Sequence, residues 1–301
     1  MSAVTSELAF SPETYTGPTS IIAEAMSDTT HLDCFDMEFQ MDRIGSSPQA
    51  IRSILDRLRK GSKFVTMYAR FTNVPPDVAK LKFSKACHQM YNPETRAMII
   101  TLPGRPHDAV AMEFTSQFIV ATFLSNMKNT LWSLSSARVE GTRCSKEPDG
   151  SWIPKDLPAS RNDTWPTIVL EVGVSESLNK LRADAAWWLS NSKGDVNLVI
   201  IISINQAVAE VTFESIVLQQ PPTYMRNGQR QYRPHTRQSI VVSRAPSSPG
   251  QPINTVPNTL PLKILFEEVL CRPPQPPETD PVISISSLEE IASAAWRWQG
   301  L

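Results

Sequence analysis

The sequence contains no apolar run that approaches the roughly 20 residues a helix needs to cross a bilayer. Its first residues, MSAVTSELAFSPETYTG, lack both the basic start and the apolar centre of a signal peptide. These absences predict an intracellular protein, in the cytoplasm or the nucleus, with no membrane contact.

Cysteine is also scarce, and the spacing of the four cysteines excludes common metal and disulfide motifs. No CxxC pair is present, which argues against a zinc knuckle and against a disulfide framework. The chain likewise contains no GxxxxGK loop, no GxGxxG after a strand and no HExxH motif. Reduced thiols are expected at all four positions: Cys34, Cys87, Cys144 and Cys271.

No charge of one sign dominates, because 29 lysines and arginines face 30 acidic residues and give a formal net charge of −1. Near-zero net charge argues against a protein that coats nucleic acid non-specifically, although it leaves room for a local basic patch. With 301 residues, 41% hydrophobic, the chain is long enough to bury a large core.

Strand and helix patterns alternate through the centre of the chain and predict an α/β fold with a mixed sheet. A strand, a helix and a second strand in succession predict two neighbouring parallel strands joined by a crossover. The expected elements are a strand over 97–103, a helix from His107 with Asp108 as N-cap, a strand running into a turn at 148–150, a strand over 167–173, a helix over 177–193 and a strand over 196–204.

Outside the centre, the pattern predicts a helix over 48–61 and a closing amphipathic helix over 287–300. Further strands are expected over 207–218, 238–243 and 261–266. We expect residues 1–45 to form an N-terminal extension and residues 46–301 a single domain. Its core covers about 80–205, and a proline-rich C-terminal extension follows it.

Three acidic residues stand where chemistry would use them: Glu113 in the predicted helix, Asp149 in the turn and Glu171 in the apolar strand TIVLEVG. Burying an unpaired carboxylate costs several kcal/mol, so Glu171 needs a cation, hydrogen bonds or a metal. If the two strands pair, Asp149 and Glu171 meet at one sheet edge and Glu113 reaches in from the helix. Such carboxylates suit Mg²⁺ or Mn²⁺, which polarise phosphoryl oxygens.

The order of these motifs resembles that of the PD-(D/E)XK, or restriction-endonuclease-like, nuclease superfamily, in a branch common among uncharacterised fungal proteins. The resemblance covers roughly residues 80–205. It rests on His107, Lys146-Glu147-Pro148-Asp149, Trp165 to Gly173, Ser175-Glu176-Ser177, Leu181, Asp184, Trp187-Trp188-Leu189 and Val199 to Ile204.

The resemblance implies a mixed central sheet flanked by helices and a nuclease that hydrolyses phosphodiester bonds with Mg²⁺ or Mn²⁺. Asp149 and Glu171 would be the metal ligands, and Glu113 a third acid. The implied partner is nucleic acid, DNA in the first place, and cutting of two strands implies a homodimer.

One departure from the superfamily pattern concerns the strand motif Glu-x-Lys, in which the lysine is replaced here by Gly173. Some branches supply this cation from the following helix, where Lys180 is the first candidate and Arg182 the second. Without that cation, the alternative is a catalytically inactive restriction-endonuclease-like domain that binds nucleic acid or protein.

Each candidate also has a structural interpretation. Asp149 suits the turn Pro-Asp-Gly by itself, and a salt bridge to Lys180 or Arg182 would compensate Glu171. Glu113 on a solvated helix face and Lys180 as an ordinary surface lysine are the corresponding alternatives.

A second functional candidate is the segment TYMRNGQRQYRPHTRQ, residues 223–238, which contains no acidic residue. Arginines that pair with phosphate and tyrosines that stack on bases are what a nucleic-acid contact needs. The alternative is a solvated basic loop. The candidate contact residues are Arg226, Arg230, Arg233 and Arg237.

Overall fold

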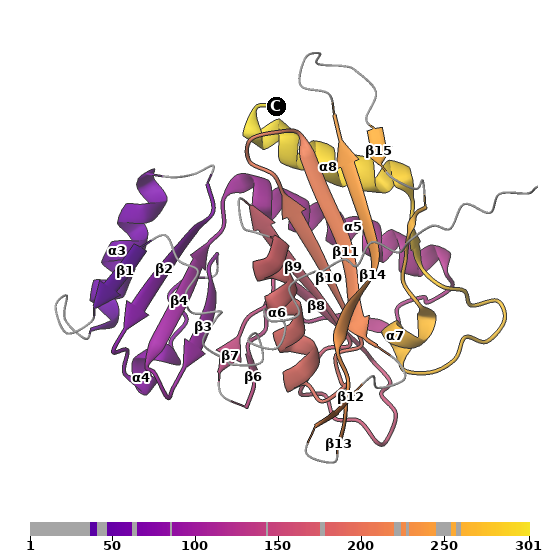
Figure 1. The fold of residues 1–301 in the computed structure, drawn as a ribbon, viewed down its shortest axis with the longest axis horizontal. Coiled ribbons are helices and arrows are strands. Elements are labelled where there is room, and N and C mark those ends of the chain that lie inside the picture. The colour runs from indigo at the N-terminus through magenta and orange to yellow at the C-terminus, as the bar shows by residue number, and fades with distance from the viewer. Residues whose placement is uncertain are drawn as a thin grey trace, which may run out of the picture.

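Two mixed sheets with helices packed against them make up the fold in a computed structural model (Figure 1). The structure describes residues 37–40, 47–61, 65–84, 86–142, 144–174, 178–219, 224–226, 229–244, 254–256 and 260–301. The predicted α/β class with a mixed central sheet flanked by helices is confirmed. This architecture is consistent with a restriction-endonuclease-like fold.

The first sheet has six strands in the order β1-β2-β4-β3-β7-β6, and only its β1–β2 pair is parallel. Helix α3 (Pro48–Gly61), predicted over the same residues, buries Ile51, Ile54 and Leu55 against this sheet. The other elements here are β1 (Met37–Gln40), β2 (Met67–Thr72), α4 (Pro76–Ala79), β3 (His88–Asn92), β4 (Ala97–Leu102), β6 (Val139–Glu140) and β7 (Ser145–Lys146).

The second sheet has seven strands in the order β15-β14-β11-β10-β9-β8-β5. Its β9 and β10 are parallel neighbours joined by helix α6 (Leu178–Asn191), so the predicted crossover unit is confirmed. The strands are β5 (Leu131–Ser133), β8 (Gly150–Pro154), β9 (Ile168–Val174), β10 (Leu198–Ile204), β11 (Glu210–Leu218), β14 (Pro234–Ser243) and β15 (Asn254–Val256).

Helices cover both faces of the second sheet. Helices α5 (Arg105–Leu124) and α8 (Ile285–Gln299) pack on one face, while α6 packs on the other. Successive side chains of a strand point to opposite faces. Leu170 and Val172 of β9 therefore join the core with α5 and α8, and Val169 and Glu171 face α6.

The remaining elements lie in the C-terminal third of the chain. Two small antiparallel pairings join β12 (Tyr224–Arg226) to β13 (Gln229–Gln231), and β16 (Leu262–Lys263) to β17 (Val282–Ile283). The predicted strand over 261–266 is wrong beyond Lys263, because the chain turns into helix α7 (Phe266–Leu270).

Two local predictions near the motif residues also need correction. Helix α5 begins at Arg105 with Gly104 as its N-cap, so Asp108 is an exposed residue of the first turn and caps nothing. The segment before Asp149 is the short hairpin β6–β7, and Asp149 itself lies directly before β8. The sequence pattern gave no indication of β2 and β3, whose residues are held by pairing with β4.

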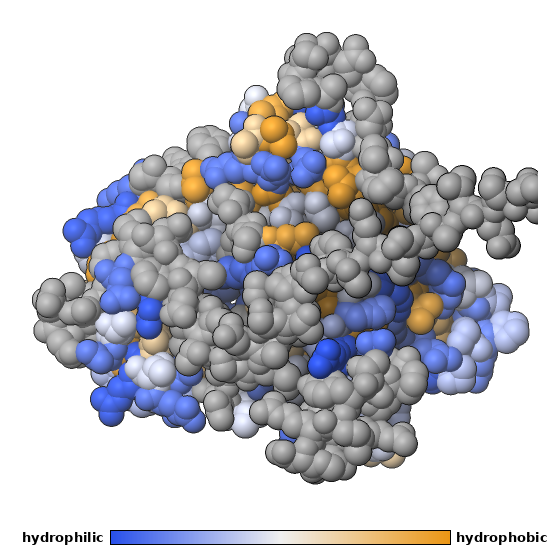
Figure 2. Space-filling model, in the orientation of Figure 1, coloured by the Kyte–Doolittle hydropathy of each residue, from blue (hydrophilic) through white to orange (hydrophobic). Residues whose placement is uncertain are grey.

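The surface seen in the orientation of Figure 1 is mostly polar along the outer edge of the first sheet (Figure 2). Apolar residues appear at the top, beside the C-terminal end of α8, where Leu301 is exposed. Among the described residues, no helix combines the length and the apolar character needed to span a membrane.

Hairpin β6–β7 is held closely against α6, and we expect Gly141→Ala to disturb it. An added Cβ would lie 2.6 Å from Cζ2 of Trp187 and 2.8 Å from the carbonyl oxygen of Cys144. Overpacking of this kind lowers the free energy of unfolding by about 1–3 kcal/mol. Urea unfolding measures the change, and Thr142→Ala at the exposed neighbouring position is the matched control. Equal stability of the two variants would contradict the close packing.

Candidate functional site

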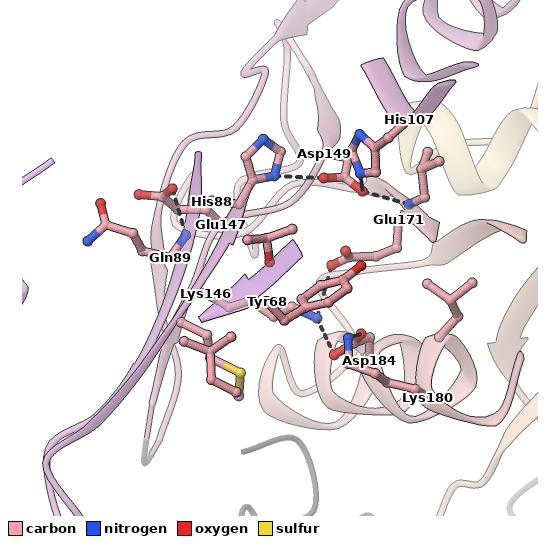
Figure 3. Close-up of a pocket in the computed structure, with 15 residues that line it drawn as sticks. Tyr68, His88, Gln89, His107, Lys146, Glu147, Asp149, Glu171, Lys180 and Asp184 are labelled. Atoms are coloured by element: carbon pink, nitrogen blue, oxygen red, sulfur yellow. Dashed lines mark hydrogen bonds and ion pairs between the residues drawn. The ribbon is translucent and has the colours of Figure 1, made fainter. Parts of the chain in front are cut away.

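A small cavity lies where the first sheet meets strand β9 and helix α6 (Figure 3). Its volume of about 50 Å³ has room for a metal ion and a water molecule, but not for a nucleotide. Strands β2, β3, β4, β7 and β9 and helices α5 and α6 contribute its lining. The polar lining residues are Tyr68, His88, Gln89, Thr101, His107, Lys146, Glu147, Asp149, Glu171, Lys180 and Asp184.

Asp149 is fixed on one side of the cavity by two histidines and one backbone group. Its Oδ1 lies 2.6 Å from Nδ1 of His88, and its Oδ2 lies 3.2 Å from Nε2 of His107 (Figure 3). The backbone N–H of Val172 donates to Oδ2 at 2.6 Å. The Asp149 N–H donates to the carbonyl of Leu170, which places the residue at the end of the β8–β9 ladder.

These contacts determine the protonation states of Asp149 and His107. Burial disfavours the carboxylate of Asp149, but His107 and His88 outweigh it and hold its pKa well below the usual range. Burial also opposes the charge of His107, yet Asp149 and Asp108 raise its pKa to about 10. Without a metal, Asp149 is therefore an anion and His107 a cation at neutral pH.

Glu171 is compensated by a protein cation and a hydrogen bond. Nζ of Lys146 lies 3.1 Å from its Oε1, and the indole N–H of Trp188 donates to the same oxygen. Burial is the main reason that the pKa of Glu171 is raised to about 7. Asp149 and Asp184 add to this rise, and Lys146 opposes it. The apolar strand thus tolerates the acid because a buried lysine faces it.

Lys146 connects Glu171 to a second acid on α6. Its Nζ lies 2.6 Å from Oδ1 of Asp184, while Nζ of Lys180 lies 3.5 Å from Oδ2 of the same residue. Lys180 also lies over the ring of Tyr68, 4.6 Å from its centroid. Burial lowers the pKa of Lys146, but Asp184 and Glu171 outweigh burial and raise it.

Of the predicted site residues, the structure brings Asp149, Glu171 and Lys180 to this cavity. Glu113 does not line it; its Oε1 accepts a hydrogen bond from Gln117 on the same helix. Arg182, the second candidate for the missing lysine, instead donates at 2.9 and 2.6 Å to the buried carboxylate of Glu214.

The predicted nucleic-acid contact is described only in part. Arg226 and Arg230 belong to β12 and β13, but their side chains lie outside the described residues. Arg233 is exposed, and Arg237 forms an ion pair with Glu268. The role of this segment stays a prediction.

The site contains residues to which sequence reasoning gave no role in it, namely His88, Lys146 and Asp184. Lys146 stands three positions before Asp149, and Asp184 stands four positions after Lys180, on the same helix face. Both spacings are visible in the sequence and could have indicated that Lys146 and Asp184 belong to the site. His88 comes from β3, far away in the sequence, and only the pairing of β3 with β4 and β7 brings it to Asp149.

The lining carboxylates that could hold a divalent cation are those of Asp149 and Glu171. Asp149 and Glu171 present oxygens to one cavity of ionic size, and Mg²⁺ is usually held by one or two carboxylates plus water and substrate phosphate. Within the described part of the chain, no three His, Cys, Asp or Glu side chains are arranged to hold a metal together. Lys146 would have to yield part of its contact with Glu171 to an ion.

Comparison with known proteins found structural likenesses but no related family. No family model and no curated protein matches the chain. A crystal structure described as "a putative nuclease belonging to DUF820", from Anabaena variabilis ATCC 29413, is 15% identical in sequence. The match covers 46% of this chain and 80% of that one, with a TM-score of 0.30. At that score the likeness carries no argument, and membership of the nuclease superfamily and its fungal branch stays a prediction.

The ion pair between His107 and Asp149 gives the metal-free protein a specific pH dependence. The pKa of His107 rises from 6.5 to about 10 on folding, so its contribution to stability is complete below pH 6.5 and is lost as the pH rises through about 10. We expect melting temperatures in EDTA to fall between pH 7 and 10, and His107→Gln to flatten this fall. His235→Gln, away from the cavity, is the control. Identical pH profiles for wild type and His107→Gln would contradict a charged pair.

Proposed function

We propose that the protein is a metal-dependent phosphodiester hydrolase acting on nucleic acid, DNA in the first place. One observation carries the proposal. Asp149, directly before β8, and Glu171, in the neighbouring antiparallel strand β9, share an ion-sized cavity with the buried ammonium group of Lys146. Two carboxylates for a metal and one cation for a phosphate are the parts that such hydrolysis requires.

In this proposal, Asp149 and Glu171 hold Mg²⁺ or Mn²⁺. The bound ion would polarise a phosphoryl oxygen and lower the pKa of a water molecule. His88 and His107 fix the orientation of Asp149 through its two oxygens, and the indole of Trp188 fixes Glu171. Residues outside the ligand pair that orient ligands in this way commonly tune metal affinity.

Lys146, rather than Lys180, is our candidate for the cation that Gly173 does not supply. Lys146 contacts the proposed ligand Glu171 directly, whereas Lys180 contacts Asp184, the second acid beside Lys146. With a metal at Glu171, the Lys146 ammonium group would keep its contact with Asp184 and would be available to a substrate phosphate. Lys180 stays in reach of the cavity as a second cation.

The first experiment is an isothermal titration of Mn²⁺ into the wild type, Asp149→Asn and Glu171→Gln. Asparagine and glutamine keep the side-chain shape and remove the charge that a divalent ion needs. We expect micromolar-to-millimolar binding to the wild type and at least about a tenfold loss in each variant.

Glu140→Gln, an exposed carboxylate on the neighbouring hairpin, is the matched control and is expected to bind as the wild type does. Metal binding that persists in both site variants would remove the two carboxylates from the metal site. Parallel cleavage assays on DNA and RNA then test the substrate class.

Measuring turnover and metal affinity together distinguishes a catalytic role of Lys146 from a purely structural one. We expect Lys146→Met to lower turnover about 100-fold, the usual effect of removing one stabilising donor. Mn²⁺ affinity is expected to stay or rise, because the ammonium group no longer competes for Glu171. Lys180→Met is expected to have a smaller effect, and the exposed Lys193→Met is the control. Equal turnover in Lys146→Met and wild type would exclude the assignment.

A second candidate function, an inactive binding module, is favoured by one specific observation. Both acids already have a protein cation beside them, Lys146 for Glu171 and His107 for Asp149, and Gly173 replaces the motif lysine. This candidate predicts no Mn²⁺ binding by the wild type. The basic segment with Arg226, Arg230 and Arg233 would then carry any nucleic-acid contact, with a steep salt dependence.

A further inference from the structure

The ammonium group of Lys146 lies between two carboxylates that come from different elements of the second sheet and its helix. Its Nζ is 3.1 Å from Oε1 of Glu171 on β9 and 2.6 Å from Oδ1 of Asp184 on α6 (Figure 3). All three side chains are buried. In enzymes that hold two divalent ions about 3.5–4 Å apart, the second ion takes a position of this kind, beside carboxylates of the first.

We infer that the Lys146 ammonium group stands in the place of a second divalent ion, so that the site takes a single Mg²⁺ or Mn²⁺ at Asp149 and Glu171. The inference rests on the proposed function and deepens it. It fixes the number of ions, and it divides the acids of the cavity into metal ligands and partners of protein cations.

Asp184 is an acid of the cavity that belongs to protein cations. Its Oδ1 lies 2.6 Å from Nζ of Lys146, and its Oδ2 lies 3.5 Å from Nζ of Lys180. An ammonium group at each oxygen competes with a divalent ion for the same lone pairs. Asp184 therefore positions two lysines and is not a ligand of the ion.

Glu147, a further acid of the lining, is occupied in the same way. Its Oε2 pairs with Nζ of Lys82, and its Oε1 lies 3.1 Å from Nη2 of Arg138. Of the four acids that line the cavity, two carboxylates thus remain for an ion, those of Asp149 and Glu171.

Glu171 makes its contacts with Lys146 and with the indole N–H of Trp188 through one oxygen, Oε1. Neither contact uses Oε2, so this oxygen can bind an ion while Lys146 stays in place. The ammonium group and the ion would then lie on different oxygens of the same carboxylate, as two neighbouring cations do.

The charges around the cavity balance with one divalent ion and not with two. Three negative charges face three positive charges among the described residues that contact one another here. The acids are Asp149, Glu171 and Asp184, and their cationic partners are Lys146, Lys180 and His107. A single divalent ion is neutralised by a substrate phosphodiester and a hydroxide ion. A second one would leave two positive charges uncompensated in a buried site, which is costly.

The space in the cavity sets the same limit. Its volume is about 50 Å³, and one water molecule takes about 30 Å³ of liquid. A second ion would need the volume that the side chain of Lys146 fills. Lys146→Ala would open that volume and leave two carboxylates beside it, whereas Lys146→Met would remove the charge and keep the volume filled.

Counting bound Mn²⁺ by isothermal titration and by electron paramagnetic resonance tests the inference. We expect one ion in the wild type, with the hyperfine spectrum of an isolated Mn²⁺. Lys146→Ala is expected to bind two ions, and coupling between ions about 4 Å apart broadens the spectrum. Lys146→Met is expected to bind one ion, and Lys128→Ala, at an exposed lysine, is the control that also binds one. Circular dichroism melting shows which variants are folded.

The outcomes separate this inference from the proposed function. Two ions in the wild type, or a coupled pair in its spectrum, would overturn the inference and leave the hydrolase proposal standing. No binding by the wild type would overturn the proposed function and the inference with it. One ion in both the wild type and folded Lys146→Ala would show that Lys146 does not exclude a second ion. The wild-type count decides the number of ions even if Lys146→Ala fails to fold.

Discussion

Compensation of buried carboxylates by buried cations is the constraint on which the rest of the structure depends. Asp149, Glu171 and Asp184 converge from the start of β8, from β9 and from α6, and none of them is stable there alone. Lys146 pairs with Glu171 and Asp184, and His107 pairs with Asp149, which His88 also contacts. Because Lys146 and His88 belong to the first sheet and the acids to the second sheet and α6, these contacts also join the two parts of the fold.

That arrangement explains why a metal site and an inert ion-pair network are hard to tell apart by residue type alone. The carboxylates that would bind a divalent ion are the ones that Lys146 and His107 neutralise in its absence. The pKa of Glu171 is raised to about 7 because the effect of burial is larger than that of Lys146. Lys146 therefore compensates the negative charge of Glu171 only in part. A divalent cation in the cavity would complete the compensation of this charge. That electrostatic requirement is the physical basis of the proposed hydrolase.

The sequence by itself determined the local features that have short-range causes. The periodicity of α3, the strand–helix–strand unit around α6 and the approach of Asp149 and Glu171 to one cavity were all predictable, because each depends on neighbouring residues or on one crossover rule. Only the tertiary structure decided that Lys146 faces Glu171, that His88 reaches Asp149 and that Arg182 belongs to Glu214. Those partners come from separate elements whose distance depends on sheet order and packing. No local pattern encodes such long-range pairing, and a cation can satisfy a buried acid from any direction.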